Sequence, residues 1–154
     1  MTVSSLITPE SVLAGIKGNS KKQILQELSE DLARLSGLPD RAIFETLLQR
    51  ERLGTTGIGQ GIAIPHGRIA GLDRLIGLFA RLARPVDFEA LDGEPVDLVF
   101  VLLAPEEAGA DHLQALARIA RLFRGPHVAQ KLRQTEDPAA LYAILTASSA
   151  PRAA

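Results

Sequence analysis

A glycine-rich segment that ends in a histidine is the part of this sequence best suited to chemistry. Residues 54–68 read GTTGIGQGIAIPHGR, so four glycines fall within eight residues and His66 follows a short apolar run. Glycine allows positive φ and close backbone approach, so successive N–H groups can converge on an anion. Pro65 fixes its own φ and favours an extended residue before it. An imidazole held rigidly beside backbone donors is suited to accepting a phosphoryl group.

The residues on either side of His66 predict its setting. The apolar run 61–64 is typical of a short buried strand, which would deliver His66 to its end. Gly67 would let the chain turn away at once, with no side chain crowding the imidazole. Taken singly, glycine clusters are usually turns, and a lone histidine at a strand end is usually a surface or packing residue. An anion site and a plain turn with a packing histidine are therefore competing hypotheses.

Other histidines and two arginines could complete such a site. His112 lies in the first turn of an expected helix after a buried strand, and ligands of open α/β sheets bind at strand ends. It could meet His66 there, or it could be an exposed residue near a helix start. Arg50 and Arg52 end an expected helix, where they could reach an anion or simply complement the helix dipole. His127 is expected to be structural or exposed.

Other patterns for phosphate or metal binding do not fit these residues. Gly61 is followed by Ile62, whereas a Walker A loop continues with Lys and Ser or Thr. The dinucleotide-binding fingerprint would need a glycine where Ile64 stands. The three histidines lack the i, i+4 spacing of a zinc site. We therefore expect neither a metal nor a cofactor.

Composition and charge narrow the class of protein. The 154 residues are 46% hydrophobic and 23% charged, which is typical of one globular domain with a proper core. The 17 basic and 18 acidic side chains give a net charge of −1, which argues against nucleic-acid binding. No cysteine, secretory signal or apolar run of membrane-spanning length is visible. A soluble cytoplasmic protein without membrane insertion is the expectation.

Apolar periodicity predicts an α/β fold in which helices cover a sheet. Helices are expected over residues 21–36, 40–53, 110–124, 128–133 and 138–146, and strands over residues 12–16, 61–64, 75–82 and 96–104. The expected helix caps are Ser20, Gly37 and Asp137.

Three further expectations concern details of these elements. Residues 85–88 should break the strand before them, since they begin with proline. The helix over 110–124 should bury one apolar stripe: Leu113, Leu116, Ala117, Ala120 and Phe123. The core should span about residues 6–146, and residues 147–154 should form a flexible tail.

The segment 57–67, GIGQGIAIPHG, closely resembles the phosphorylation site of the IIA components of the bacterial phosphoenolpyruvate-dependent phosphotransferase system. The match is to the fructose–mannitol class, and the chain is most similar to its nitrogen-regulatory type. Arg50-Glu51, PVDL at 95–98 and HLQ at 112–114 also match the family. The resemblance covers roughly residues 6–146, so the whole chain, 1–154, is interpreted as a single type-2 IIA domain.

This resemblance implies a role for each candidate residue. His66 would be the phosphorylated residue, Arg50 would help to hold the phosphoryl group, and His112 would sit beside it. The phosphate-binding loop would be formed by a set of small residues: Thr56, Gly57, Gly59 and Gly61. The resemblance also implies a mixed β-sheet sandwiched between helices, and a small histidine-bearing carrier protein as the phosphoryl donor.

The chemistry of the imidazole is compatible with these roles. Its ordinary pKa is about 6.5, so much of it is a neutral nucleophile at cellular pH. The second ring nitrogen of His66 should be held by an acceptor such as a backbone carbonyl, which would fix the tautomer. Backbone N–H groups and the Arg50 guanidinium would stabilise the phosphoryl charge.

Three functions remain open on the sequence alone. The favoured one is a phosphocarrier with a nitrogen- or potassium-type regulatory role towards unidentified target proteins. The second is a sugar-transport IIA that passes phosphate to a IIB domain. The third is a protein-binding module that works without phosphorylation. Whether the protein counts as an enzyme is open, because its phosphohistidine would be an intermediate in protein-to-protein transfer.

Overall fold

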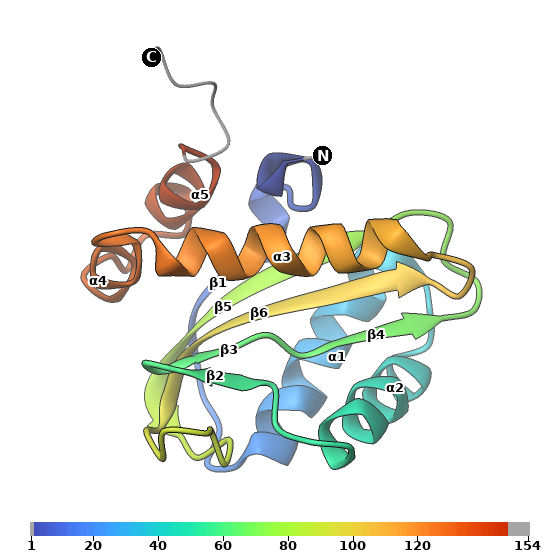
Figure 1. The fold of residues 1–154 in the computed structure, drawn as a ribbon, viewed down its shortest axis with the longest axis horizontal. Coiled ribbons are helices and arrows are strands. Elements are labelled where there is room, and N and C mark those ends of the chain that lie inside the picture. Colours follow the sequence, from blue (N-terminus) through green and yellow to red (C-terminus); the bar gives the residue numbers. More distant parts are fainter. Residues whose placement is uncertain (1, 148–154) are drawn as a thin grey trace.

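The computed structural model describes residues 2–147 and shows a mixed sheet with helices on both faces (Figure 1). The helices are α1 (Lys21–Ser36), α2 (Asp40–Arg52), α3 (Ala110–Arg124), α4 (Val128–Arg133) and α5 (Pro138–Ala147), and short 3₁₀ turns cover Val3–Ser5 and Pro9–Ser11. The strands are β1 (Val12–Ile16), β2 (Gly57–Gly59), β3 (Ile62–Ala63), β4 (His66–Ile69), β5 (Ile76–Val86) and β6 (Val96–Pro105). The predicted α/β sandwich is confirmed.

The sheet is built around β6, the most apolar strand. Its order is β1-β5-β6-β3-β2, and β4 also pairs with β6. The β5–β6 pair is antiparallel, whereas β1 runs parallel to β5, and both β3 and β4 run parallel to β6. A strand covered on both faces is expected to be a continuous apolar run, which is what β6 is.

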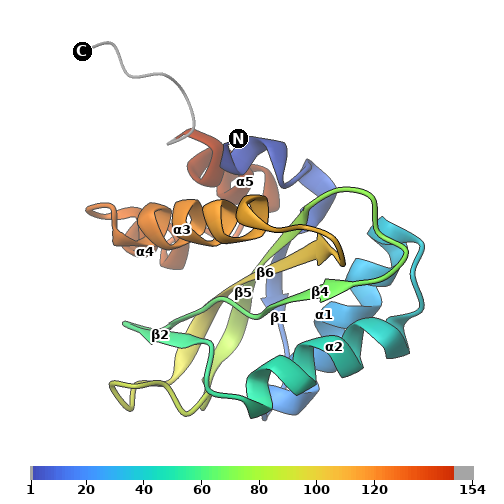
Figure 2. The same ribbon diagram turned by 45° about the vertical axis from the view of Figure 1, so that its right-hand side comes forward.

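Two apolar clusters lie on opposite faces of this sheet. One packs α1 and α2 against the sheet, and the other packs α3, α4 and α5 against the opposite face (Figure 2). Alternate residues of β6 serve the two clusters, as the two-residue period of a strand requires. Val99, Val101 and Leu103 face α1 and α2, and Leu98, Phe100 and Leu102 face α3.

Strands β3 and β4 are two parts of one interrupted strand. Both keep the same register on β6, since Ile62 pairs with Leu98 and His66 pairs with Leu102. The interruption falls at Ile64 and Pro65, because Pro65 has no N–H to donate to β6. The Ile64 N–H lies on the side away from β6 and donates to the Thr56 carbonyl at 2.9 Å. His66 therefore does not end the first strand, as predicted, but begins its continuation.

Helix ends follow the predicted chemistry. The Ser20 side chain accepts a hydrogen bond from the Gln23 N–H, and Gly37 ends α1 at φ 77°. Asp137 accepts a hydrogen bond from the Ala140 N–H at 3.0 Å, so it caps the start of α5. These three caps are confirmed.

The predicted apolar stripe of α3 is right for Leu116, Ala120 and Phe123, which pack on the sheet side, and wrong for Leu113 and Ala117. Leu113 is 68% exposed and Ala117 is also exposed, whereas His112, Ala115 and Ile119 are buried. The buried face continues through Leu122 and Phe123. The helix is therefore rotated so that a histidine, rather than the leucine after it, begins its buried face.

Strand β5 also differs from its prediction, because it continues through Pro85 to Val86. The ladder with β6 is irregular between Arg81 and Val86. Proline is tolerated at such an irregularity, where no ladder hydrogen bond needs its missing N–H. At the C-terminus, Ala147 still belongs to α5, and the rest of the predicted tail, 148–154, lies outside the described residues.

Two absences apply to the described part of the chain. None of its helices combines the length and the apolar character needed to cross a membrane. Over the same residues, 2–147, no cluster of three His, Cys, Asp or Glu side chains is placed to hold a metal ion.

The sequence predicted that the chain would turn away at Gly67. Instead, Gly67 continues β4 and lets α2 approach that strand. It pairs with Leu103 within β4. A Cβ at this position would lie 2.6 Å from Cγ2 of Thr46 on α2, which is closer than carbon atoms can pack. The glycine is therefore required by the close contact between a helix and a strand.

We expect Gly67→Ala to destabilise the fold by about 1–3 kcal/mol, the usual cost of overpacking. Urea unfolding followed by circular dichroism measures this loss. The double variant Gly67→Ala/Thr46→Ser removes Cγ2 while keeping the Thr46 hydroxyl type, and should recover most of the stability. A loss that persists in the double variant would mean that the Cβ–Cγ2 contact is not its cause.

Candidate functional site

His66 is presented at the interruption between β3 and β4. Its side chain is half-buried, and Nδ1 lies 2.9 Å from the Ile64 carbonyl oxygen, two residues earlier. A carbonyl can only accept, so Nδ1 carries the proton and Nε2 carries the lone pair. The predicted backbone acceptor is thus confirmed, and it leaves Nε2 as the nucleophilic atom.

Arg50, on the last turn of α2, faces this lone pair. Its Nε donates to His66 Nε2 at 3.2 Å, and its Nη1 donates to the Gly54 carbonyl at 2.9 Å. The guanidinium is therefore held between the Gly54 carbonyl and His66 Nε2, the atom to which a phosphoryl group would bind. Of the two arginines that the sequence offered, the structure brings Arg50 to His66 and leaves Arg52 exposed.

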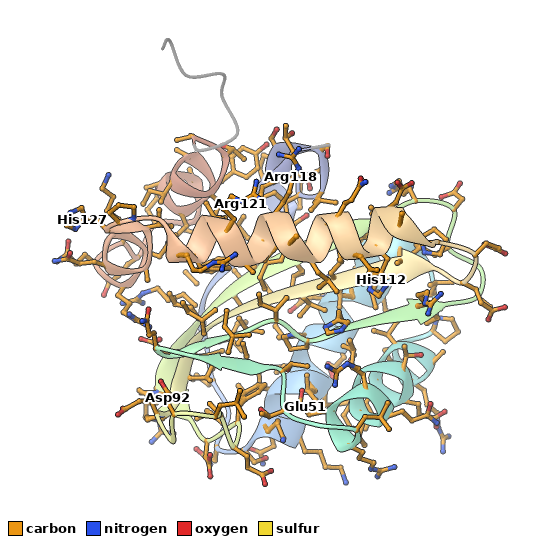
Figure 3. All side chains as sticks on the ribbon, in the orientation of Figure 1. Glu51, Asp92, His112, Arg118, Arg121 and His127 are labelled. Atoms are coloured by element: carbon orange, nitrogen blue, oxygen red, sulfur yellow. The ribbon has the colours of Figure 1, made fainter. Side chains whose placement is uncertain are left out.

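His112 approaches from the opposite face of the sheet. Figure 3 shows it pointing from the start of α3 towards the sheet. Its ring centroid lies 5.6 Å from that of His66, and the residue is 9% exposed. His112 Nε2 is buried and has no hydrogen-bond partner among residues 2–147. Such an atom costs about 1–3 kcal/mol, so it points to a partner that arrives with a ligand.

Burial makes both imidazoles poor bases. Desolvation lowers the pKa of His66, and the Arg50 charge lowers it further, while the Ile64 hydrogen bond and the Glu51 charge act in the opposite direction. Desolvation likewise lowers the pKa of His112, with added effects from His66 and Arg68. Both rings are therefore neutral near pH 7, and the His66 lone pair is available there.

The glycine segment forms a β2–β3 hairpin in which three backbone N–H groups bind side chains of this chain. The Thr56 N–H donates to the Glu51 carboxylate at 3.0 Å, and the Gly57 N–H donates to Thr55 Oγ1 at 3.0 Å. At the tip, the Gln60 N–H donates to Asp92 at 2.8 Å. The sequence predicted that backbone N–H groups of this segment would converge on an external anion. Three of them instead bind oxygen atoms of this chain.

Gly59 and Gly61 lie at the turn of this hairpin, with φ of 101° and 80°. A Cβ on Gly59 would lie 3.1 Å from Asp92, and one on Gly61 would meet the Arg133 guanidinium. The structure therefore brings His66, Arg50 and His112 together and leaves these two glycines beside other partners.

One buried charge in this region was missed by sequence reasoning. Glu51 directly follows Arg50 and is 5% exposed. The pair Arg50-Glu51 in the motif drew attention to the arginine, and nothing in the helix pattern distinguished the carboxylate from a solvated one. His127, in contrast, is exposed, as predicted, and stands at the N-cap position of α4 with φ 69° and no capping hydrogen bond from its side chain.

Known proteins have a similar sequence and the same fold. The family model described as "Phosphoenolpyruvate-dependent sugar phosphotransferase system, EIIA 2" matches residues 5–148. A nitrogen regulatory protein of Bradyrhizobium diazoefficiens is 59% identical over 145 residues, which are 94% of this chain and 95% of that protein. A nitrogen regulatory protein of Escherichia coli is 37% identical over 147 residues, which are 95% and 90% of the two chains.

The crystal structure of the nitrogen regulatory protein IIA-Ntr from Neisseria meningitidis has the same architecture. It superposes with a TM-score of 0.88 at 39% identity, covering 94% of this chain and 99% of that one. The resemblance stated from the motif is therefore confirmed over nearly the whole described chain. The protein belongs to the EIIA 2 family of the phosphoenolpyruvate-dependent sugar phosphotransferase system.

Proposed function

We propose that this protein is a phosphocarrier that accepts a phosphoryl group on Nε2 of His66 and acts in nitrogen- or potassium-type regulation. The observation that carries the proposal is the Nδ1 contact with the Ile64 carbonyl, which leaves the Nε2 lone pair facing Arg50. The regulatory role is supported by near-full-length relatives named nitrogen regulatory protein. The sugar-transport alternative rests on a more distant relative, a fructose-specific EIIA component of Haloferax volcanii that is 35% identical over 147 residues, against 59% for the Bradyrhizobium nitrogen regulatory protein.

The transfer step follows from this geometry. The Nε2 lone pair attacks phosphorus on a donor phosphohistidine, the donor N–P bond breaks, and its electron pair returns to the donor imidazole. Arg50 must first release Nε2, because its Nε–H occupies that lone pair. Its bond to Gly54 keeps the guanidinium nearby, so it can then pair with the phosphoryl oxygens.

His112 supplies the second stabilising contact. Its unpartnered Nε2 can donate a hydrogen bond to a phosphoryl oxygen, which would end the cost of its burial. A phosphate contact from Thr56, Gly57, Gly59 or Gly61 stays a prediction, since the hydrogen bonds described at this hairpin are internal to the chain.

IIA domains of this system exchange phosphate with other phosphotransferase proteins. We infer that the donor here is a small histidine-bearing carrier protein, that the chain is one type-2 IIA domain over 1–154, and that it works in the cytoplasm. Phosphorylation would add about −1.5 to −2 charges at His66, by analogy with other phosphorylated side chains, and so change which regulatory target docks.

Incubation with phosphoenolpyruvate, enzyme I and the small carrier protein should add one acid-labile phosphate, measured by intact mass. We expect His66→Ala to abolish this mass shift and the exposed control His127→Ala to keep it. A phosphate on His127, or no mass shift with a competent donor, would contradict the proposal. A deletion strain that loses growth on one sugar, with potassium and nitrogen control intact, would favour the sugar-transport alternative.

Arg50→Ala and His112→Ala should slow phosphorylation without removing the acceptor. Each loses a hydrogen bond to a charged group, worth about 1.5–3 kcal/mol, so we expect each rate to fall by about ten- to a hundredfold. Single-turnover kinetics measure the change. The exposed Arg52→Ala serves as the matched control, and an equal effect of Arg52→Ala would remove the assignment to Arg50.

The pKa of His66 should lie below its value in an unstructured peptide of residues 61–69. Since a protonated Nε2 has no lone pair, phosphorylation should slow only below the ordinary imidazole range of about 6.5. Arg50→Ala should raise the pKa of His66, because the Arg50 charge lowers it. Nuclear magnetic resonance titration of the ring signals tests both statements, and a lowered pKa in Arg50→Ala would refute the second.

A further inference from the structure

Glu51 is a buried carboxylate that the proposed transfer step does not use. Its side chain is 2% exposed, and it lies at the end of α2 (Figure 3), directly after Arg50 in the sequence. Burying a charge is costly unless it is paired and hydrogen-bonded. The partners of Glu51 therefore indicate what the fold gains by keeping it.

Three groups donate to this carboxylate. The Thr56 N–H donates to Oε2 at 3.0 Å, the Thr56 hydroxyl donates to Oε1, and Lys21 Nζ lies 3.3 Å from Oε2. Lys21 also pairs with Glu89, whose side chain is 77% exposed. Of the two carboxylates that pair with Lys21, the buried Glu51 therefore also binds Thr56, and the exposed Glu89 does not.

Thr56 connects Glu51 to the nucleophile. The Thr56 carbonyl accepts the Ile64 N–H at 2.9 Å, and the Ile64 carbonyl in turn contacts His66 Nδ1 at 2.9 Å. A single hydrogen bond therefore links Thr56, which Glu51 holds, to Ile64, whose carbonyl fixes the tautomer of His66.

The same segment connects Glu51 to Arg50. Gly54 lies between α2 and Thr56, its N–H contacts the Glu51 backbone carbonyl at 3.2 Å, and its own carbonyl accepts Arg50 Nη1. Anchoring Thr56 by two hydrogen bonds fixes the far end of this short connection. Both reacting side chains thus rely on carbonyls whose positions depend on residues 54–56.

We propose that Glu51 is a positioning residue for phosphoryl transfer, acting through Thr56 on the carbonyls that orient His66 and Arg50. This inference rests on the proposed function of His66. A carboxylate suits the task because it only accepts, so it can bind both Thr56 donors at once. A glutamine would turn an NH₂ group towards one of them. Supporting hydrogen bonds of this kind hold reacting groups in alignment, and small displacements of those groups reduce rates strongly.

The test compares single-turnover phosphorylation of full-length variants that remain folded. We expect Glu51→Gln and Thr56→Val each to lower the maximal rate by about ten- to a hundredfold, as a misplacement of about 1 Å can. The donor concentration at half-maximal rate should not change, because both side chains are buried. Thr56→Ser, which keeps the hydroxyl, should recover the rate, and the exposed control Glu89→Gln should leave it unchanged.

A double-mutant cycle separates this role from general stability. Glu51→Gln/Thr56→Val should be no slower than the slower single variant, because the two residues act as one unit. A rate loss in the double variant equal to the product of the two single losses would overturn the proposal. So would folded variants with lower thermal midpoints but a wild-type rate, which is the pattern of a merely structural residue.

A second readout does not depend on phosphorylation. The His66 Nδ1 proton should exchange with water faster in Glu51→Gln and Thr56→Val than in the wild type or in Glu89→Gln, as measured by nuclear magnetic resonance. Unchanged exchange would overturn the inference. If the wild type accepts no phosphate, the proposed function fails, and proton exchange alone then decides whether Glu51 positions His66.

Discussion

The break between β3 and β4 is the structural constraint on which the site depends. Gly61 and Pro65 direct their carbonyls at β6, so Ile64 between them directs its N–H and carbonyl away from β6: the N–H meets the Thr56 carbonyl, and the carbonyl holds His66 Nδ1. Pro65 keeps the break in place, since it has no N–H for the ladder and its own carbonyl accepts the Leu102 N–H.

The position of this break at one side of the sheet explains how two helices reach one imidazole. Helices α2 and α3 lie on opposite faces, and among the described strands β4 pairs only with β6. Beyond β4 no further strand separates the faces, so Arg50 arrives from α2 and His112 from α3. Gly67 makes the close approach of α2 possible, because Thr46 occupies the space that a side chain at position 67 would need.

Electrostatics and burial act together at the site. Desolvation keeps both imidazoles neutral, and Arg50 supplies the positive charge that the incoming phosphoryl group requires. Glu51 lies beside that arginine, yet its hydrogen bonds run to Thr56 and Lys21 rather than to the guanidinium. Arg50 is therefore not neutralised by its neighbour and stays available to an anion.

The sequence by itself determined the features that depend on near neighbours. Helix caps, the five helices, the motif around His66 and the acceptor for Nδ1 all involve residues within a few positions of one another, where backbone geometry decides the outcome. The short strands β2 and β4 were not predicted, because each is defined by its pairing partner in the sheet. The buried face of α3, the purpose of Gly67 and the burial of Glu51 were decided only by tertiary structure. Each depends on which distant segment packs there: the sheet under His112, Thr46 against Gly67, and Lys21 against Glu51, 30 positions apart. No local pattern encodes such contacts, because they exist only after the chain has folded.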